Sequence, residues 1–208
     1  MNASRNPWDE DYLRRGRLWG GSASSLPRLP CSFRILELGC GDGKTAASLV
    51  QAGCSVTAID LSPHAASLCR NICTDPDRVS ILIADSRQTP FCNESFDVVI
   101  ASHITGHLSI DGRRHLASEV LRLHIPGGSM YFRDFSTRDF RYGRGEKTET
   151  GTFTRKNGIT THYFTNEEVM TLFSGLEVLS LVQHRWEMRV RGMNLPRAEI
   201  VAEFKKFA

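Results

Sequence analysis

The sequence predicts an α/β fold with a mostly parallel, seven-stranded sheet, helices on both faces and an antiparallel hairpin at the C-terminal end. Three observations lead to this expectation. A short apolar strand at residues 35–38 runs directly into a glycine-rich turn and a helix. Four more predicted strands alternate with helical segments, which is typical of a parallel sheet with right-handed crossovers. Two further strands, at 176–191 and 198–204, follow each other without a helix between them.

The first unit carries the most informative motif. Ile35–Leu38 is short and apolar, as a buried parallel strand is. Alternate glycines follow at Gly39, Gly41 and Gly43, and then a helix-forming stretch at 45–50. Glycine lets the backbone bend sharply and approach a ligand closely, and a helix amino terminus offers free N–H donors. Together these features predict a cofactor-binding turn.

Acidic residues end the next two predicted strands. Asp60 follows the strand at 54–59, and Asp85 follows the strand at 79–84. Ligands of open α/β sheets bind at the carboxyl ends of the strands, so both acids are candidate ligand contacts. A purely structural role, including turn formation by Asp85 with Ser86, stays the alternative.

The glycine turn differs from a dinucleotide-binding site in two respects. The spacing is Gly-x-Gly-x-Gly instead of Gly-x-Gly-x-x-Gly, and Glu37 stands two residues before the first glycine. This pattern resembles the first motif of the Rossmann-like class I S-adenosylmethionine (SAM) methyltransferases. The resemblance extends over residues 33–135 and includes the sequence Pro126-Gly127-Gly128 as a turn into a fifth strand at 129–135.

The resemblance implies that SAM is the cofactor and S-adenosylhomocysteine the product. SAM carries a sulfonium and an amino-acid tail, so an acid beside the turn suits it. The implied cofactor contacts are Glu37, Gly39, Cys40 and Gly41 at the amino-acid end, Asp60 and Leu61 at the ribose, Asp85 and Ser86 at the adenine, and Ala101 beyond the fourth strand.

Two histidines follow the fourth predicted strand, at 96–100. His103 and His107 lie in a loop that should face both the methyl donor and the acceptor. Histidine at such a place serves as a general base or a substrate contact, with a structural histidine as the alternative. We expect Asp111 to cap the next helix, which runs to about residue 124.

The segment 1–32 precedes the first strand and is predicted to be a lid and linker. It is rich in Ser, Pro and Gly but contains aromatic and charged residues, and it would drift unless docked. We expect Tyr12, Arg17 or Trp19 to touch the cofactor. The alternative is that the aromatic side chains only fix the segment to the domain. Residues 22–30 are interpreted as linker.

The segment 136–158 is interpreted as a substrate-side loop inserted into the domain 33–208. It combines arginine, aromatic and glycine residues, including Arg141, Tyr142 and Arg155. Such side chains can bind phosphate and stack on bases, and long loops in compact domains are usually functional. A solvated loop is the alternative. Beyond it, Asn157-Gly158 predicts a turn and Thr165 to Glu168 a helix capping box.

The C-terminal part resembles a second family, the tRNA 3-methylcytidine methyltransferases. The similar residues are Arg133-Asp134-Phe135, the segment 152–165 and the basic final hairpin, although Phe135 stands where that family often has tyrosine. The resemblance implies an acceptor pocket involving Arg133, Asp134, Arg155 and Arg185. We therefore predict His103, Arg133 and Asp134 as catalytic residues. The predicted substrate-binding residues are His107, Arg141, Tyr142, Arg155, His162 and Arg185.

Composition narrows the remaining possibilities. The 208 residues fit one domain, and no apolar run approaches the ~20 residues of a membrane helix. Six cysteines occur without a Cys-x-x-Cys pair, so we expect no metal site and reduced thiols in a cytoplasmic protein. The net charge of +3 comes from residues 131–208, with 13 basic and 10 acidic residues. A solvated surface and an anionic partner explain it equally well.

The functional hypothesis is methyl transfer from SAM to a base nitrogen of RNA, of the cytosine N3 type in tRNA. A small-molecule or protein methyltransferase, with 136–158 as a lid, is the alternative. A SAM-binding protein without catalysis is a third possibility, and the sequence leaves open whether an accessory protein takes part.

Overall fold

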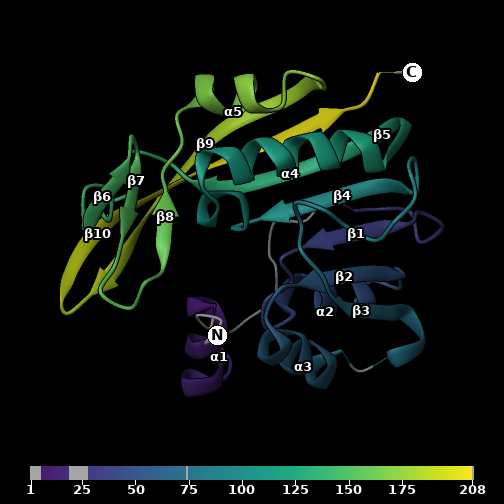
Figure 1. The fold of residues 1–208 in the computed structure, drawn as a ribbon, viewed down its shortest axis with the longest axis horizontal. Helices are drawn as coiled ribbons and strands as arrows, with labels where there is room; N and C mark the ends of the chain where they lie inside the picture. Colours follow the sequence, from purple (N-terminus) through teal and green to yellow (C-terminus); the bar gives the residue numbers. More distant parts are fainter. Residues whose placement is uncertain (1–5, 19–27, 74, 208) are drawn as a thin grey trace, which may run out of the picture.

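A seven-stranded sheet forms the centre of the protein, seen here in a computed structural model that describes residues 6–18, 28–73 and 75–207 (Figure 1). Its strand order is β3-β2-β1-β4-β5-β10-β9. The strands are β1 (Ile35–Leu38), β2 (Val56–Asp60), β3 (Val79–Ile83), β4 (Phe96–Ser102), β5 (His124–Phe135), β9 (Glu177–Val190) and β10 (Met193–Lys205). The first five are parallel, and β10 pairs antiparallel with both β5 and β9. The predicted fold class is thereby confirmed.

Five α-helices and two 3₁₀ turns join these strands within the described residues. They are α1 (Pro7–Arg15), α2 (Lys44–Gln51), α3 (Pro63–Ile72), η1 (Pro76–Arg78), η2 (Thr105–His107), α4 (Ile110–Leu123) and α5 (Asn166–Leu172). Among the described residues, we find no helix with the length and apolarity needed to cross a membrane.

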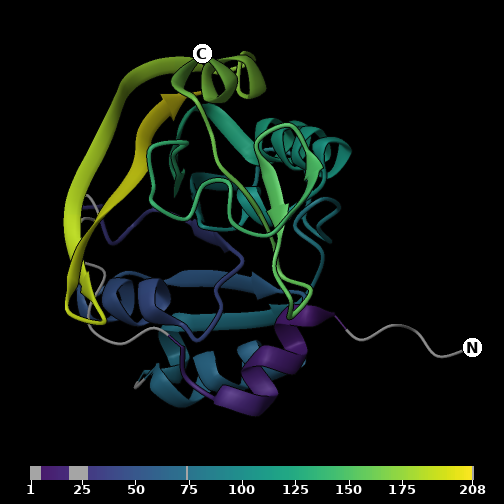
Figure 2. The ribbon, with the colours of Figure 1, turned by 90° about the vertical axis from the view of Figure 1, so that its left-hand side faces the viewer.

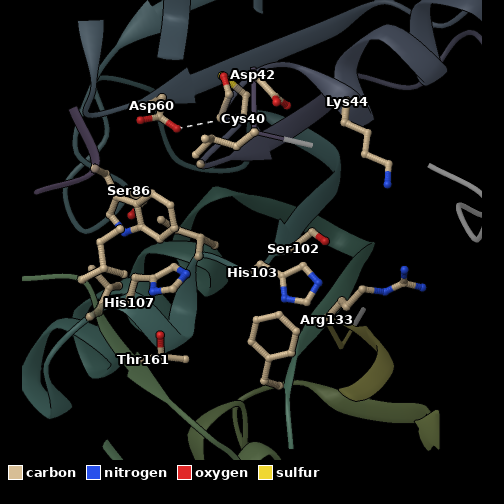
Figure 3. Close-up of a pocket in the computed structure, with 18 of the residues that line it drawn as sticks. Cys40, Asp42, Lys44, Asp60, Ser86, Ser102, His103, His107, Arg133 and Thr161 are labelled. Carbon is tan, nitrogen blue, oxygen red and sulfur yellow. Dashed lines mark hydrogen bonds between the residues drawn. The ribbon is translucent and has the colours of Figure 1, made fainter. Parts of the chain in front are cut away.

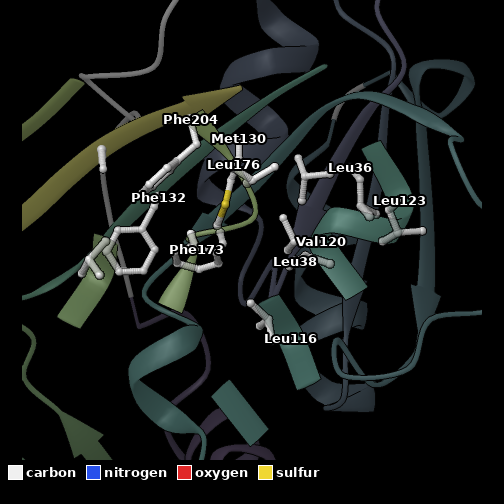
Figure 4. Packing of buried hydrophobic residues seen from close by; sticks show 14 of the residues in the cluster. Leu36, Leu38, Leu116, Val120, Leu123, Met130, Phe132, Phe173, Leu176 and Phe204 are labelled. Carbon is white, nitrogen blue, oxygen red and sulfur yellow. The ribbon is translucent and has the colours of Figure 1, made fainter. Parts of the chain in front are cut away.

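Strand alternation divides the core into two clusters, one on each face of the sheet. In β1, Leu36 and Leu38 belong to the cluster that contains the buried side of α4, Val169 of α5 and the residue after it, Phe173, as Figure 4 shows for Leu116, Val120 and Phe173. Ile35, on the opposite face, packs with α2 and α3. Successive side chains of a strand point to opposite faces, so a continuous apolar run serves both layers.

Helix starts follow the sequence signals in two of three cases. Ser62 caps α3 with Pro63 at the first position, and Thr165 with Glu168 forms a capping box at α5, both as predicted. The prediction for α4 was wrong. Ser109 is its cap, because the Ser109 hydroxyl accepts the N–H of Gly112, and Asp111 lies in the first turn.

We expected Pro126-Gly127-Gly128 to be a turn that precedes a strand. The three residues instead lie within β5. The register between β4 and β5 shifts there, so the three residues form an irregularity in a strand that begins at His124. Gly127 has a φ of 75°, which a side chain would disfavour.

The segment 136–158 is more ordered than a loop. It contains β6 (Glu146–Glu149) and β7 (Thr152–Thr154), which pair with β8 (Thr160–His162) in a small antiparallel sheet. The predicted turn at Asn157-Gly158 joins β7 to β8. Figure 2 shows this sheet, the β9–β10 hairpin and α1 arranged around one side of the molecule. Local strand pairing, which the sequence signals did not reveal, is the reason for the difference.

Candidate active site

A cavity of about 1360 Å³ lies at the carboxyl ends of the parallel strands. The turn after β1 and the ends of β2 and β3 form one part, and α1 borders it. The turn after β4, the end of β5 and the β9–β10 hairpin form the other part. Figure 3 shows this division, with Cys40 and Asp60 on one side and His103, His107 and Arg133 on the other. The strand-end rule for α/β sheets therefore locates the cavity correctly.

The glycine turn approaches its neighbours too closely for side chains. Gly39 and Gly41 have φ values of 67° and 54°. A Cβ on Gly39 would lie 2.8 Å from the side chain of Ile104, and one on Gly41 would lie 2.6 Å from the hydroxyl of Tyr12. The positive φ favours glycine at both positions, and the Cβ and Cγ1 of Ile104 also leave no space for a side chain at Gly39.

Asp60 fastens this turn to the start of α3. One carboxylate oxygen accepts the N–H of Gly41 at 2.9 Å, drawn as a dashed line in Figure 3, and the other accepts the N–H of Ser62 at 2.9 Å. Burial raises the pKa of Asp60 in spite of these bonds. The carboxylate retains lone pairs for further donors at the cavity wall, so a ribose contact stays a prediction compatible with its place.

Glu37 supplies the test of whether the site fits SAM. Its side chain is buried and lines the cavity, and its Oε2 has no hydrogen-bond partner among the described residues. Burial raises the pKa of Glu37 well above the usual range. An acceptor buried without a donor is costly, and the ammonium group of SAM is a donor of the required charge. The residues present therefore fit this cofactor.

Asp85 and Ser86 also line the cavity, at the end of β3. The carboxylate of Asp85 forms a bidentate ion pair with Arg87, with atom separations of 2.9 and 2.6 Å. This pairing lowers the pKa of Asp85. Ser86 is buried beside the Asp85–Arg87 ion pair. The adenine contact of Asp85 and Ser86 stays a prediction.

Helix α1 borders both parts of the cavity. Tyr12 lies over the glycine turn, and the ring of Trp8 packs edge-on against that of His107 with centroids 4.6 Å apart. Asp9 accepts a hydrogen bond from the hydroxyl of Ser62. Arg17 is exposed and does not line the cavity. Trp19, with part of the predicted linker, lies outside the described residues, and the lid stays a prediction.

His103 occupies the floor of the acceptor side. Its Nδ1 lies 3.8 Å from Asp134 and its Nε2 lies 3.5 Å from Glu199. Burial opposes a charge on this ring, but the two carboxylates raise the pKa of His103. Asp134 itself is fully buried and bonds the N–H of Gly106 at 2.7 Å, so it supports the histidine turn from beneath the cavity. Asp134 is not among the residues that line the cavity, and its predicted catalytic contact stays a prediction.

His107 behaves in the opposite way. Its Nδ1 donates to the carbonyl of Thr160 at 2.6 Å, which ties η2 to the small sheet. Burial lowers the pKa of His107, whereas the carboxylates beside His103 raise the pKa of that residue. The two predicted histidines thus share one turn but differ in electrostatic environment.

A group of stacked planar side chains forms the wall beyond His103. The ring of Phe135 lies 4.4 Å from that of His103, and the guanidinium of Arg141 lies 3.8 Å from the same ring centroid. Arg197 reaches both Phe135 and Trp186 at 5.2 Å. The buried carboxylate of Asp139 pairs with Arg141 and Arg197 at 2.7 Å each and fixes both guanidiniums. Arginine and aromatic planes held in this way suit a flat, electron-rich acceptor.

Some of the other predicted site residues face the cavity and others face away from it. Arg133 and Arg155 line the cavity. In β9 the lining residues are Val182, His184, Trp186 and Met188, so Arg185 faces the other side and bonds Gln183. Ala101 is buried in the core, where its side chain contacts apolar neighbours.

Two further predicted substrate contacts support the small sheet instead. Tyr142 packs edge-on against Phe153 and Tyr163 and is absent from the cavity lining. His162 is buried and pairs with Glu168 at 2.9 Å. Sequence reasoning missed Glu199, His184, Trp186 and Arg197, although the period-two pattern of the last strands would have placed them on one face.

Comparison with known proteins agrees with this geometry. Residues 35–128 match a family model described as a methyltransferase domain. The chain is 29% identical over 200 residues to the tRNA N(3)-cytidine methyltransferase METTL2 of Bos taurus, covering 88% of this chain and 53% of that protein. It is 36% identical over 121 residues to the demethylmenaquinone methyltransferase of Clavibacter sepedonicus, covering 58% of this chain and 49% of that protein. The chain thus spans about half the length of these curated relatives.

Solved structures share the fold. A SAM-dependent methyltransferase from Methanosarcina mazei superposes with a TM-score of 0.73 at 23% identity, covering 86% of this chain and 95% of that one. The 1,6-didemethyltoxoflavin-N1-methyltransferase of Burkholderia thailandensis, crystallised with S-adenosylhomocysteine, gives a TM-score of 0.62 at 16% identity, covering 98% and 78%.

Proposed function

Because the chain shares the fold of solved SAM-dependent methyltransferases and residues 35–128 match the model of a methyltransferase domain, we propose that it methylates a base nitrogen of RNA, of the cytosine N3 type in tRNA. The observation that carries this proposal is the extent of the similarity to METTL2. An alignment over 88% of the chain includes most of residues 129–208, the part of the chain that contains Phe135, Arg141, Trp186 and Arg197 of the acceptor wall.

The residues of the cofactor part would hold SAM by charge and shape. Glu37 would accept from the ammonium group, and the backbone of Gly39 and Gly41 would lie against the amino-acid end. Asp60 would accept from the ribose hydroxyls. When bound, SAM supplies an electrophilic methyl group on a sulfonium. The protein's contribution is then to align an acceptor lone pair with that methyl, which is mainly proximity catalysis.

The acceptor wall supports a flat base as substrate. Phe135, Arg141 and Trp186 present planar surfaces, and Arg155 adds a positive charge at the cavity. A base in a duplex cannot enter such a site, so the target would lie in a loop or be unpaired. Phosphates beside the base would meet Arg155 and Arg141.

A small-molecule acceptor is the second candidate. The similarity to the demethylmenaquinone methyltransferase favours it, since that relative shows the higher identity over a shorter alignment. The modest net charge of +3 also suits a small substrate. The cavity volume of about 1360 Å³ accommodates SAM together with either a small acceptor or one flipped base.

Labelled SAM separates the two candidates. The purified protein is incubated with methyl-labelled SAM and bulk tRNA, and in parallel with a metabolite extract. We expect label in tRNA that digests to methylcytidine, and none with the variant Gly41→Arg. Label confined to small molecules would refute the RNA proposal.

A matched pair of arginine variants tests the acceptor wall. Arg155→Ala should weaken tRNA binding and reduce its salt slope by about one, because a cavity-lining cation is lost. Arg185→Ala is the control, because the side chain of Arg185 faces away from the cavity. This variant should lose less tRNA affinity, and its salt slope should stay closer to that of the wild type. Equal losses would show that the cavity does not receive the RNA.

A further inference from the structure

Thr161 carries a buried hydroxyl at the cavity that the fold itself does not use. The side chain is 1% exposed, and its Oγ1 has no hydrogen-bond partner among the described residues. Its neighbours in β8 differ, because Thr160 bonds Thr154 at 2.8 Å and His162 bonds Thr152 at 2.7 Å. Alternate side chains of a strand point to opposite faces, so Thr161 points away from these pairs, and it lines the cavity. A buried polar atom without a partner is costly, which indicates a ligand group at this place.

His107 stands beside this hydroxyl with a fixed arrangement of ring hydrogens. Its Nδ1 lies 2.6 Å from the carbonyl oxygen of Thr160. A carbonyl only accepts hydrogen bonds, so Nδ1 carries the hydrogen, and the Nε2 of the neutral ring presents a lone pair. This Nε2 has no hydrogen-bond partner in the part of the chain that the structure describes. Figure 3 shows the Thr161 hydroxyl directed toward the His107 ring, so two hydrogen-bond acceptors lie together at the cavity wall.

The surroundings of His107 favour the neutral ring. Burial is the main cause, and His103 and Arg155 act in the same direction, whereas Asp134 favours the charged ring. The net result is a lowered pKa for His107. Trp8 packs edge-on against the ring, and the bond from Nδ1 fixes its orientation. The lone pair of Nε2 is therefore held in one place.

We propose that His107 and Thr161 form a subsite for an exocyclic amino group of the acceptor base, next to the nitrogen that is methylated. This inference rests on the proposed function and deepens it, because it assigns the residues that distinguish an amino-bearing base from a carbonyl-bearing one. An amino group has two N–H bonds, one for the lone pair of His107 and one for the oxygen of Thr161. A carbonyl oxygen at the same place would meet the lone pair of Nε2 and be repelled.

The opposite side of the acceptor pocket has the complementary chemistry. Arg133 lines the cavity beside His103, and Figure 3 shows both across the pocket from His107 and Thr161. A guanidinium donates hydrogen bonds and does not accept them, so it suits a carbonyl oxygen. The two sides together match a ring nitrogen with an amino group on one side and a carbonyl on the other. Cytosine has this arrangement, whereas uracil has carbonyls on both sides of a nitrogen that carries a hydrogen.

The first test measures binding and needs no methyl transfer. The affinities of the protein for cytidine and for uridine are measured by NMR titration in the presence of S-adenosylhomocysteine. We expect cytidine to bind at least about tenfold more tightly, as hydrogen-bond readout of a base edge does. In the free protein, the ring nitrogen shifts of His107 should report a hydrogen on Nδ1 and none on Nε2. Cytidine binding no tighter than that of uridine, or a hydrogen on Nε2, overturns the proposal.

Variants test the two residues separately. Thr161→Val keeps the shape of the side chain but removes the hydroxyl, so cytidine affinity should fall about two- to tenfold while uridine affinity stays the same. His107→Gln replaces the lone pair by an amide that both accepts and donates, so the preference for cytidine should shrink. Thr105→Val is the control, because Thr105 also has a buried hydroxyl without a partner among the described residues but is absent from the cavity lining. If Thr161→Val loses no more cytidine affinity than this control, the subsite is wrong.

Stability distinguishes a ligand-binding hydroxyl from a structural one. The hydroxyl of Thr161 lacks a partner in the folded protein, so Thr161→Val should unfold at a denaturant concentration no lower than the wild type. Thr154→Val removes the bond to Thr160 and should unfold at a lower concentration. A loss of stability in Thr161→Val as large as that in Thr154→Val would mean a structural role and overturn the subsite.

The outcomes also separate this subsite from the proposed function. If bulk tRNA is not methylated but these residues still make cytidine bind more tightly than uridine, the RNA acceptor fails and the subsite stands. If tRNA is methylated and both variants keep the wild-type preference for cytidine, the subsite fails and the RNA acceptor stands.

Discussion

At the residue scale, the unpaired oxygen of Glu37 yields a sharp prediction. Glu37→Gln removes the negative charge but keeps the shape, so SAM binding should weaken about ten- to hundredfold, as the loss of a charged hydrogen bond does. Wild-type affinity should also fall as the pH drops through the raised pKa of Glu37, since only the ionised carboxylate attracts an ammonium group. Isothermal titration calorimetry measures both effects.

The matched control for this change is Glu94→Gln. Glu94 is half exposed and pairs with Lys206, away from the cavity. The affinity of the Glu94→Gln variant for SAM, and the pH dependence of that affinity, should equal those of the wild type. If Glu37→Gln bound SAM as tightly as this control, the assignment of Glu37 to the cofactor would be wrong.

Asp139 yields a prediction about stability. Burial opposes its charge, yet the hydrogen bonds from Arg141 and Arg197 lower the pKa of Asp139. A depressed pKa stabilises the fold above the unfolded-state value and loses that contribution as the pH falls through the folded-state value. Asp139→Asn should therefore cost about 3–5 kcal/mol near neutral pH, and the difference from wild type should shrink in acid.

Denaturant unfolding at several pH values measures this cost. Asp111→Asn is the control, since Asp111 and Arg114 form an exposed pair that contributes about 0–1 kcal/mol. Equal stability of the two variants would mean that the buried pair does not hold the acceptor wall together.

At the element scale, α1 connects the two parts of the cavity. Trp8→Ala removes the aromatic contact with His107 but leaves Tyr12 over the glycine turn. We expect SAM to dissociate about two- to tenfold faster, because an aromatic pair contributes about 0.5–1.5 kcal/mol. Stopped-flow displacement measures the rate. Leu13→Ala, an exposed position on the same helix, should leave it unchanged, and similar rates in both would contradict a closing role for α1.

Elements differed in how well the sequence predicted them. Buried parallel strands and capped helices have local signals, so β1 to β4, α3 and α5 were expected where they lie. A short extended piece was expected at 159–164, where β8 lies, but β6 and β7 were not, because these short, polar strands show no period-two apolar pattern and depend on pairing with each other. The cap of α4 was misplaced by two residues because serine and aspartate are both good caps.

At the scale of the whole molecule, the sequence predicted the cofactor half better than the acceptor half. The cofactor half depends on one continuous motif and on two strand ends, and the parallel sheet imposes the geometry of those strand ends. The acceptor half depends on pairing between β5 and β10. This pairing places Phe135 opposite Glu199, although the two residues are 64 positions apart in the sequence. The period-two pattern could have placed Glu199 and His184 on one face of the hairpin, but no local pattern specifies this register, so their position at the cavity emerged only from the structure.

The contacts of α1 also have a consequence for the order of events in a catalytic cycle. Tyr12 of α1 covers the glycine turn while Trp8 touches the histidine turn, so the helix cannot leave one part of the cavity without disturbing the other. Exchange of SAM for its product would therefore require an empty acceptor side. We expect a sequential ordered kinetic scheme in which SAM binds first and S-adenosylhomocysteine leaves last. Product inhibition by S-adenosylhomocysteine should be competitive toward SAM and non-competitive toward the acceptor.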